Sequence, residues 1–149
     1  MKNFLLALVA VILTIPMLGI ACAPRIYVND QRRTLTIEEK QASAVVTAYM
    51  NHTLGTLPTA QIDYEKAKAL LVSDLAHDFQ SAAFIPVSYC MQEGPAQVRI
   101  VSAEFADLNN WIEVEVEGQY GKTWQSMWRF HVISDDNGGW LINEIECLN

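Results

Sequence analysis

The chain has 149 residues, which is enough for one ordinary domain. Hydrophobic residues make up 51% of the sequence and charged residues 18%, and this balance excludes a chain that is disordered throughout. The 17 acidic residues outnumber the 10 lysines and arginines, so the net charge is −7. A broadly basic surface for nucleic acid is therefore excluded, and we expect no nucleic-acid partner.

The first residues have the organisation of an export signal. Lys2 supplies a positive start, and no residue from Phe4 to Ala23 is charged. The segment Leu18-Gly19-Ile20-Ala21-Cys22 resembles the bacterial lipoprotein box, in which the cysteine thiol is acylated and becomes the new N-terminus. The match is partial, because Gly19 stands where that box usually has leucine. An uncleaved membrane anchor and simple secretion are the alternatives.

All three readings place the folded part of the chain outside the cytoplasm. We expect residues 1–21 to be a signal peptide and residues 22–36 to be a tether that starts at an acylated Cys22. Residues 37–149 then form a single domain in the bacterial cell envelope, held at the membrane by its N-terminal lipid or anchor.

The two cysteines in the body of the chain, Cys90 and Cys147, predict one disulfide. An oxidising compartment favours pairing of two cysteines that lie far apart in the sequence. Neither cysteine has a second cysteine or a histidine at the short spacing of a zinc site, and the Cys-x-x-Cys pattern of a catalytic dithiol is absent from the sequence.

Two helices are predicted ahead of the sheet. The capping-box pattern Thr36-Ile37-Glu38-Glu39 predicts a helix that begins at Ile37 and stops near Gly55. Helical spacing predicts that its buried side carries Ile37, Ala44, Val45, Ala48 and Tyr49, and that its polar side carries Lys40, Ser43, Thr47 and Asn51. A second helix is predicted from Pro58 and Thr59 to about Phe79, with an apolar stripe of Tyr64, Ala67, Leu71, Leu75 and Phe79.

After Pro86 the apolar positions recur every second residue, which predicts strands near 98–106, 111–119, 124–132 and 140–147. The second strand is predicted to direct Ile112, Val114 and Val116 to one face and Glu113, Glu115 and Glu117 to the other. The third strand is predicted to direct Trp124, Trp128, Phe130 and Val132 to one face and Gln125, Arg129 and His131 to the other. The last strand is predicted to carry Leu141, Ile145 and Cys147 on one face.

The turns predict how these strands pair. The predicted three-residue connection Tyr120-Gly121-Lys122 keeps both apolar sets on one face, and one such register places Glu113 opposite Arg129. A slip of two residues would change the partners and keep the faces. The segment 135–139, Asp-Asp-Asn-Gly-Gly, is the strongest turn signal in the chain. We therefore expect an α+β fold, with two N-terminal helices packed on a curved antiparallel sheet of about four strands.

The closing residues resemble a known superfamily. The aromatic strand from Trp128 to Ile133, the turn, and Gly138-Gly139-Trp140-Leu141-Ile142 are similar to the end of nuclear-transport-factor-2-like (cystatin-like cone fold) proteins. The resemblance covers about residues 37–148 and is strongest to small exported lipoproteins. It implies a cone-like domain and no particular activity, because the superfamily contains isomerase-like and dehydratase-like enzymes, ligand-binding proteins and assembly modules.

Three functional hypotheses follow, of which the last is a structural or assembly role through an exposed face of the sheet. The first is a non-enzymatic exported domain that binds an apolar small molecule or a partner protein, with Tyr49, Trp124, Trp128 and Phe130 as possible pocket lining and core packing as the alternative for the aromatic residues. The second is a pocket enzyme of isomerase or dehydratase type that uses His131 as general base.

Other polar groups have a simpler interpretation. Asp74, His77 and Asp78 are close on a predicted helix, but such a group is typical of a solvated face. His52 is predicted to be half-buried or capping, and the glutamates 113, 115 and 117 to form a solvent face paired with Arg129, although such a row could attract a cation. We therefore expect no metal site and no cofactor.

Overall fold

The chain forms helices first and then a sheet, as the change in hydrophobic period predicts. The computed structural model describes residues 33–54, 62–81, 90, 94–106 and 110–148. In chain order the elements are α1 (Ile37–Thr53), α2 (Tyr64–Lys68), α3 (Ser73–Ser81), β1 (Gln97–Phe105), β2 (Trp111–Tyr120), β3 (Thr123–Ser134) and β4 (Trp140–Cys147). The α+β prediction is confirmed: N-terminal helices pack on a four-stranded antiparallel sheet.

The start of α1 is fixed by the predicted capping box. The Thr36 hydroxyl accepts a hydrogen bond from the Glu39 backbone N–H, and the Glu39 carboxylate accepts one from the Thr36 N–H. Glu39 is 1% exposed, and its carboxylate pairs with the Arg33 guanidinium, which also donates to the carbonyl of Ala103 in β1. These contacts attach the residues before α1 to the sheet.

The buried side of α1 differs from the predicted one. It carries Glu39, Ala42, Ser43, Val46, Tyr49, Met50 and Thr53, whereas Ile37 is 72% exposed and Ala44 is also exposed. Hydrophobic spacing does not reveal this buried side, because three of its residues, Glu39, Ser43 and Thr53, are polar. Ser43 and Thr53 donate their hydroxyls to carbonyls one turn earlier in the helix, and Glu39 belongs to the cap, so these groups are satisfied locally.

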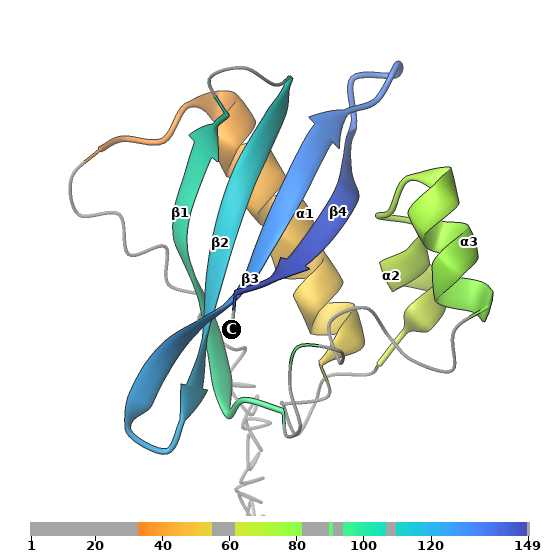
Figure 1. Ribbon diagram of the computed structural model, residues 1–149. Coiled ribbons are helices and arrows are strands. Elements are labelled where there is room, and N and C mark those ends of the chain that lie inside the picture. Colours follow the sequence, from red (N-terminus) through yellow and green to blue (C-terminus); the bar gives the residue numbers. More distant parts are fainter. Residues whose placement is uncertain (1–32, 55–61, 82–89, 91–93, 107–109, 149) are drawn as a thin grey trace, which may run out of the picture.

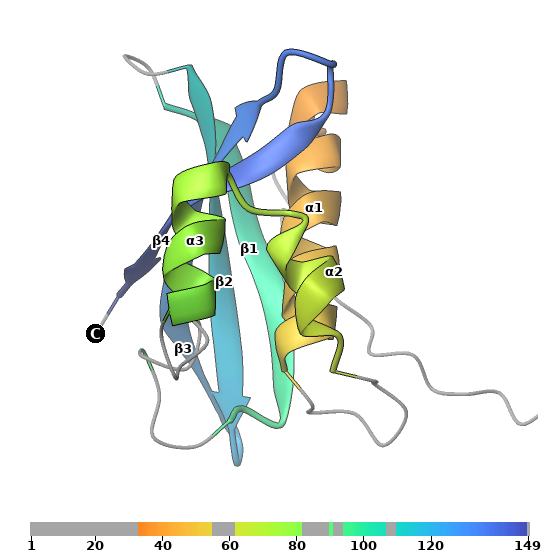
Figure 2. The same cartoon turned by 90° about the vertical axis from the view of Figure 1, so that its right-hand side faces the viewer.

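The predicted second helix is interrupted, and its start at Pro58 lies outside the described residues. Two short helices, α2 and α3, are separated by residues 69–72. At this break Leu71 forms a parallel bridge with Ile142, in which the Val72 N–H donates to the Ile142 carbonyl and the Ile142 N–H donates to the Leu70 carbonyl. Figure 2 shows α2 beside α1, and Figures 1 and 2 show α3 on the β4 side of the sheet. These backbone groups bond to the edge of β4, whereas in a continuous helix they would bond within the helix.

The sheet is a simple meander in the order β1-β2-β3-β4, and α1 crosses one of its faces (Figures 1 and 2). We call this face the inner face and the opposite one the outer face. The core between α1 and the inner face contains aliphatic and aromatic side chains from all four strands. The largest buried apolar members are Val46, Tyr49, Met50, Ile100, Ile112, Val114, Val116, Trp128, Phe130 and Ile142.

Each strand pairing contains one β-bulge. The unpaired residues are Val101 in β1, Met127 in β3 and Asn143 in β4. A bulge increases the local twist and changes which residues of the strand face each side of the sheet. The predicted alternation therefore holds only along parts of β1, β3 and β4.

The β2–β3 hairpin shows this effect most clearly. Its connection has two residues, Gly121 and Lys122, because Tyr120 pairs with Thr123, so the predicted three-residue loop is wrong. Gly121 has φ 60°, which suits the first position of a glycine-first hairpin turn. With a two-residue connection, the apolar residues of β3 would lie opposite the glutamates of β2. The extra residue at Met127 shifts the pairing by one, so that Trp128 lies opposite Val116 on the inner face. Beyond the bulge Glu113 opposes His131 and Glu115 opposes Arg129, a slip of two residues from the predicted partners.

Three side chains lie on the face opposite to the predicted one, and the first of them, Gln125, pairs with Gly118 on the inner face. Trp124 precedes the bulge at Met127 and pairs with Gln119, and it lies on the outer face with the Arg99 guanidinium 4.2 Å from its ring centroid. Leu141 precedes the bulge at Asn143 and pairs with Ile133 on the outer face, while Ile145 faces inward opposite Phe130. Trp124 and Trp128 therefore do not line the same surface.

Gly118 permits a close approach that a side chain would prevent. A Cβ atom at this position would lie 2.9 Å from Cβ of Pro95 and 3.2 Å from Cγ of Met127. We expect Gly118→Ala to lower the free energy of unfolding by about 1–3 kcal/mol because the backbone near Pro95 must shift. Urea unfolding measures this loss, and Gln119→Ala on the outer face is the control. Equal stability of Gly118→Ala and the parent chain would contradict the prediction.

The predicted signal peptide, Cys22 and most of the tether lie outside the described residues. Within the described part of the chain, none of the helices has both the length and the apolar character that crossing a bilayer requires.

Candidate functional site

The outer face of the sheet carries a band of charged side chains. Alternation along β2 directs three glutamates to this face, and the register then brings in two basic residues from β3 and two glutamates from β4. Figure 1 views this face, with α1 behind the strands. The members of the band are Glu113, Glu115, Glu117, Arg129, His131, Glu144 and Glu146.

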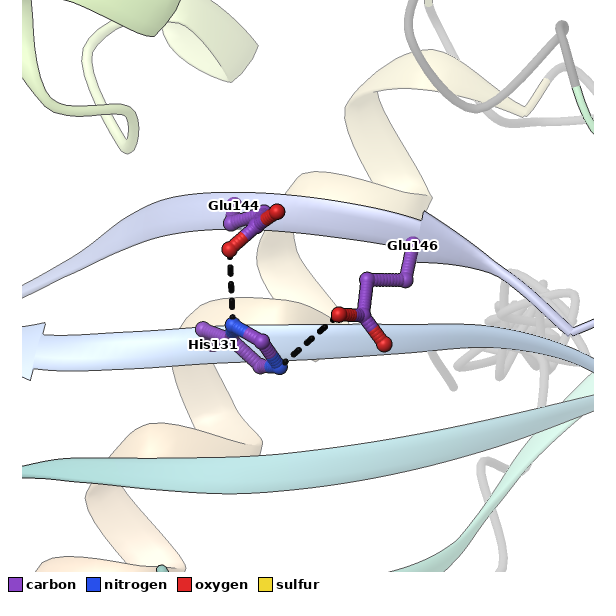
Figure 3. A group of neighbouring side chains, drawn as sticks. All are labelled: His131, Glu144 and Glu146. Carbon is purple, nitrogen blue, oxygen red and sulfur yellow. Dashed lines mark hydrogen bonds and ion pairs between the residues drawn. The ribbon is translucent and has the colours of Figure 1, made fainter. Parts of the chain in front are cut away.

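His131 lies at the centre of this band between two carboxylates. Its Nδ1 atom is 3.0 Å from Oε2 of Glu144, its direct partner on β4, and its Nε2 atom is 3.6 Å from Oε1 of Glu146 (Figure 3). The ring stacks on Trp111, with centroids 5.1 Å apart and an angle of 11° between the planes. Only 6% of His131 is exposed, although it faces away from the core. The imidazole is therefore held in one orientation by its neighbours.

Arg129 organises the carboxylates next to His131. Its guanidinium contacts Glu115 at 2.8 Å and Glu146 at 3.4 Å, and its Nε atom is 3.7 Å from Glu113. The hydrogen bond to Glu115 is the main reason why the pKa of Arg129 is raised. Arg129 contacts Oε2 of Glu146, and the other oxygen of the same carboxylate, Oε1, lies on the side of His131.

The band has an excess of negative charge. Two guanidinium groups, from Arg129 and from Arg99 paired with Glu117 at 2.6 Å, face five carboxylates. An uncompensated group of carboxylates around a histidine attracts cations. The predicted pairing of the β2 glutamates with Arg129 is confirmed for Glu113 and Glu115, whereas Glu117 pairs with Arg99.

The residues predicted as pocket lining do not form one surface. Tyr49, Trp128 and Phe130 are fully buried in the core, where Tyr49 and Phe130 meet edge to face with centroids 6.0 Å apart. Burial also raises the pKa of the Tyr49 phenol, whose hydroxyl has no hydrogen-bond partner among the described residues. Trp124 lies on the outer face. A ligand pocket lined by these side chains stays a prediction.

The predicted disulfide between Cys90 and Cys147 is confirmed. The two Cα atoms are 5.3 Å apart, and the bond attaches the end of β4 to a residue that precedes β1. Cys22, the predicted lipid attachment site, lies outside the described residues.

The polar groups of the helices remain apart from this band. Asp74, His77 and Asp78 are all exposed on α3, in agreement with the prediction of a solvated helix face. His52 is half-buried near the end of α1, and its carbonyl accepts a hydrogen bond from the Asp63 N–H. Asp63 caps α2, and hydrogen bonds from the backbone and side chain of Lys66 lower the pKa of its carboxyl group.

We compared the chain with protein-family models, curated proteins and solved structures. None gives a significant match. The resemblance to the nuclear-transport-factor-2-like superfamily therefore stays a prediction.

Sequence reasoning singled out His131 and missed its two partners, Glu144 and Glu146. The alternation of these glutamates around Ile145 was a usable signal, because it predicts a common face for both. Their distance from His131, however, depends on the register across the turn at residues 135–139 and on the bulge at Asn143. Neither feature can be read from alternation alone.

Proposed function

We propose that this protein is an exported domain, tethered to the membrane through Cys22, that acts by binding a partner and not by catalysis. The observation that carries the proposal is the disulfide between Cys90 and Cys147, together with the charged start and apolar run of the first 23 residues. A disulfide forms and persists in an oxidising compartment. The tether keeps the domain beside the membrane.

The packing of the core favours a protein partner over an apolar small molecule. Tyr49, Trp128 and Phe130 are fully buried among other side chains, so a ligand that used them would have to displace core residues. A protein partner can instead contact the outer face of the sheet, which α1 does not cover and which carries an excess of carboxylates around Arg129. Such a face provides electrostatic complementarity without loss of core packing.

Export and acylation are tested together by intact-mass analysis of the native protein recovered from the membranes of a bacterial host. We expect a chain that begins at Cys22 and carries the added mass of lipid. The matched variant Cys22→Ser is expected to lose the lipid mass and to leave the membrane fraction. Recovery of unprocessed chain from the cytosol with Cys90 and Cys147 reduced would overturn the proposal.

The alternative of a pocket enzyme is favoured by one contact, the 3.0 Å approach of Glu144 to Nδ1 of His131. A carboxylate in this position orients a histidine that acts as general base. Turnover of an isomerase or dehydratase substrate by the purified protein, lost in His131→Ala and retained in His77→Ala, would replace the binding proposal by this alternative.

A further inference from the structure

The side chains around His131 bring one imidazole and two carboxylates close together. Among the described residues, His131, Glu144 and Glu146 each offer one ligand atom, and these atoms lie within 4.8 Å of one another. We propose that these three side chains form a binding site for a single zinc-class divalent metal ion on the outer face of the sheet. The inference is independent of export, because it rests only on side chains of the sheet.

The first argument is the position of the two ring nitrogens. A neutral imidazole has one N–H donor and one lone-pair acceptor. In the tautomer with the proton on Nδ1, that N–H donates to Glu144, which lies at hydrogen-bonding distance, and Nε2 offers a lone pair. Oε1 of a second carboxylate, Glu146, lies 3.6 Å from Nε2. A metal ion bound between Nε2 and Oε1 would use both acceptors.

The second argument is the distance between these two atoms. Zinc binds imidazole nitrogen and carboxylate oxygen with bonds of about 2.0–2.1 Å. Two such bonds that meet at the tetrahedral angle of about 109° span about 3.3–3.4 Å, which is close to the 3.6 Å between Nε2 and Oε1. A small shift of the two side chains would therefore place both atoms for one ion.

The third argument is the support given to both ligands. Glu144 accepts the Nδ1 proton, and this carboxylate–histidine pairing is the usual way in which a protein orients a metal-binding histidine. Arg129 contacts Oε2 of Glu146 and so directs Oε1 toward the site. Trp111 stacks on the imidazole and limits its rotation. We therefore assign His131 and Glu146 as direct ligands and Glu144 as the orienting carboxylate, with water in the remaining positions.

The donor set indicates the class of metal. A site that contains an imidazole suits zinc and its borderline neighbours, whereas calcium and magnesium prefer sites made only of oxygen atoms. The excess of carboxylates in the band favours a cation of charge two. The proposal differs from the sequence expectation of no metal site, because the strand register brings together residues that no short motif connects.

The test is titration of the full chain in detergent micelles, stripped with EDTA, with zinc chloride and calcium chloride in a non-chelating buffer. All chains carry Cys22→Ser, since a free thiol also binds zinc, and no reductant is present, so that the disulfide remains intact. Calorimetry is expected to show one zinc ion per chain and at least about tenfold weaker binding of calcium. Nitrogen NMR of the histidine rings is expected to show a zinc-dependent shift at Nε2 of one ring, and His131→Ala removes that signal.

The variants separate ligands from neighbours. His131→Ala and Glu146→Gln are expected to weaken zinc binding by about 100-fold or more, because each removes a direct ligand. Glu144→Gln retains an oxygen acceptor for the Nδ1 proton and is expected to weaken binding by roughly tenfold or less, whereas Glu144→Ala is expected to lose about 10–100-fold. Glu104→Gln is the matched control, since it removes one exposed carboxylate from the outer face of β1, and it is expected to change the affinity by less than about twofold.

Circular dichroism first establishes that each variant is folded. Absence of stoichiometric zinc binding to the folded parent chain would overturn the proposal. So would an unchanged affinity in His131→Ala or Glu146→Gln, because zinc would then be bound elsewhere. An equal loss in Glu104→Gln would show attraction by general negative charge instead of a site.

Discussion

Replacing Trp128 with alanine is expected to lower the free energy of unfolding by about 3–5 kcal/mol. The side chain is fully buried on the inner face, where the register places it between Val116 of β2 and Cys147 of β4. Its removal deletes a large apolar surface and leaves a cavity that the sheet and α1 can fill only in part. Because single domains are stable by only 5–15 kcal/mol, we expect a large decrease in the urea midpoint measured by circular dichroism.

The matched control is the same substitution on the other side of the bulge. Trp124 lies on the outer face and stacks with Arg99, so Trp124→Ala is expected to cost only about 1 kcal/mol or less. Comparable losses in Trp124→Ala and Trp128→Ala would show that the bulge at Met127 does not separate the two side chains. The pair of variants therefore tests the register of β3 as well as the core.

Removal of the disulfide is expected to have the second-largest effect. The bond closes a loop with a sequence separation of 57, and a crosslink of this span stabilises a domain by about 2–4 kcal/mol, mainly by restricting the unfolded chain. We expect the double variant Cys90→Ser/Cys147→Ser to unfold roughly 10 °C or more below the parent chain. Thermal unfolding followed by circular dichroism, without reductant, measures the difference.

Cys22→Ser serves as the control for the loss of a thiol elsewhere in the chain. This variant is expected to unfold within about 2 °C of the parent chain, because residue 22 lies outside the loop that the disulfide closes. Addition of a reductant is expected to lower the stability of Cys22→Ser to that of the double variant. Insensitivity of the parent chain to reductant would contradict the prediction.

The parts of the fold that could be predicted from the sequence are those specified by local chemistry. The capping box of Thr36 and Glu39 correctly places the start of α1. The strict alternation of β2 correctly assigns Ile112 and Val114 to the core and Glu113 to the outer face. In both cases the physical cause, a hydrogen-bonded cap or a period of two, lies within a few neighbouring residues.

The parts that could not be predicted depend on contacts between distant segments. Residues 69–72 leave the helical conformation because the edge of β4 offers them hydrogen bonds at Ile142. The bulges at Met127 and Asn143 are determined by the pairing of whole strands, and they reverse the predicted faces of Trp124 and Leu141. The sequence around each bulge shows no glycine that would mark it.

The candidate site combines both kinds of feature. His131 could be selected from the sequence because it falls on the polar face of a predicted strand and histidine is the usual side chain for acid–base chemistry near neutral pH. Its contacts with Glu144 and Glu146 arise only after the turn at residues 135–139 and the bulge at Asn143 have set the register. A site built from adjacent strands in this way has no fixed spacing in the sequence that a motif could capture.

The three bulges also determine how the chain tolerates changes in length. Because a bulge accommodates one extra residue, deletion of Asn143 would leave Ile142 followed by Glu144 in regular alternation, with Glu144 still opposite His131. Loss of a paired residue such as Ile145 would instead reverse the inward and outward positions that follow it, and would direct Cys147 away from Cys90. Related chains are therefore expected to vary in length at the surface connections and at the bulges, and to keep the number of paired residues in β1, β3 and β4 constant.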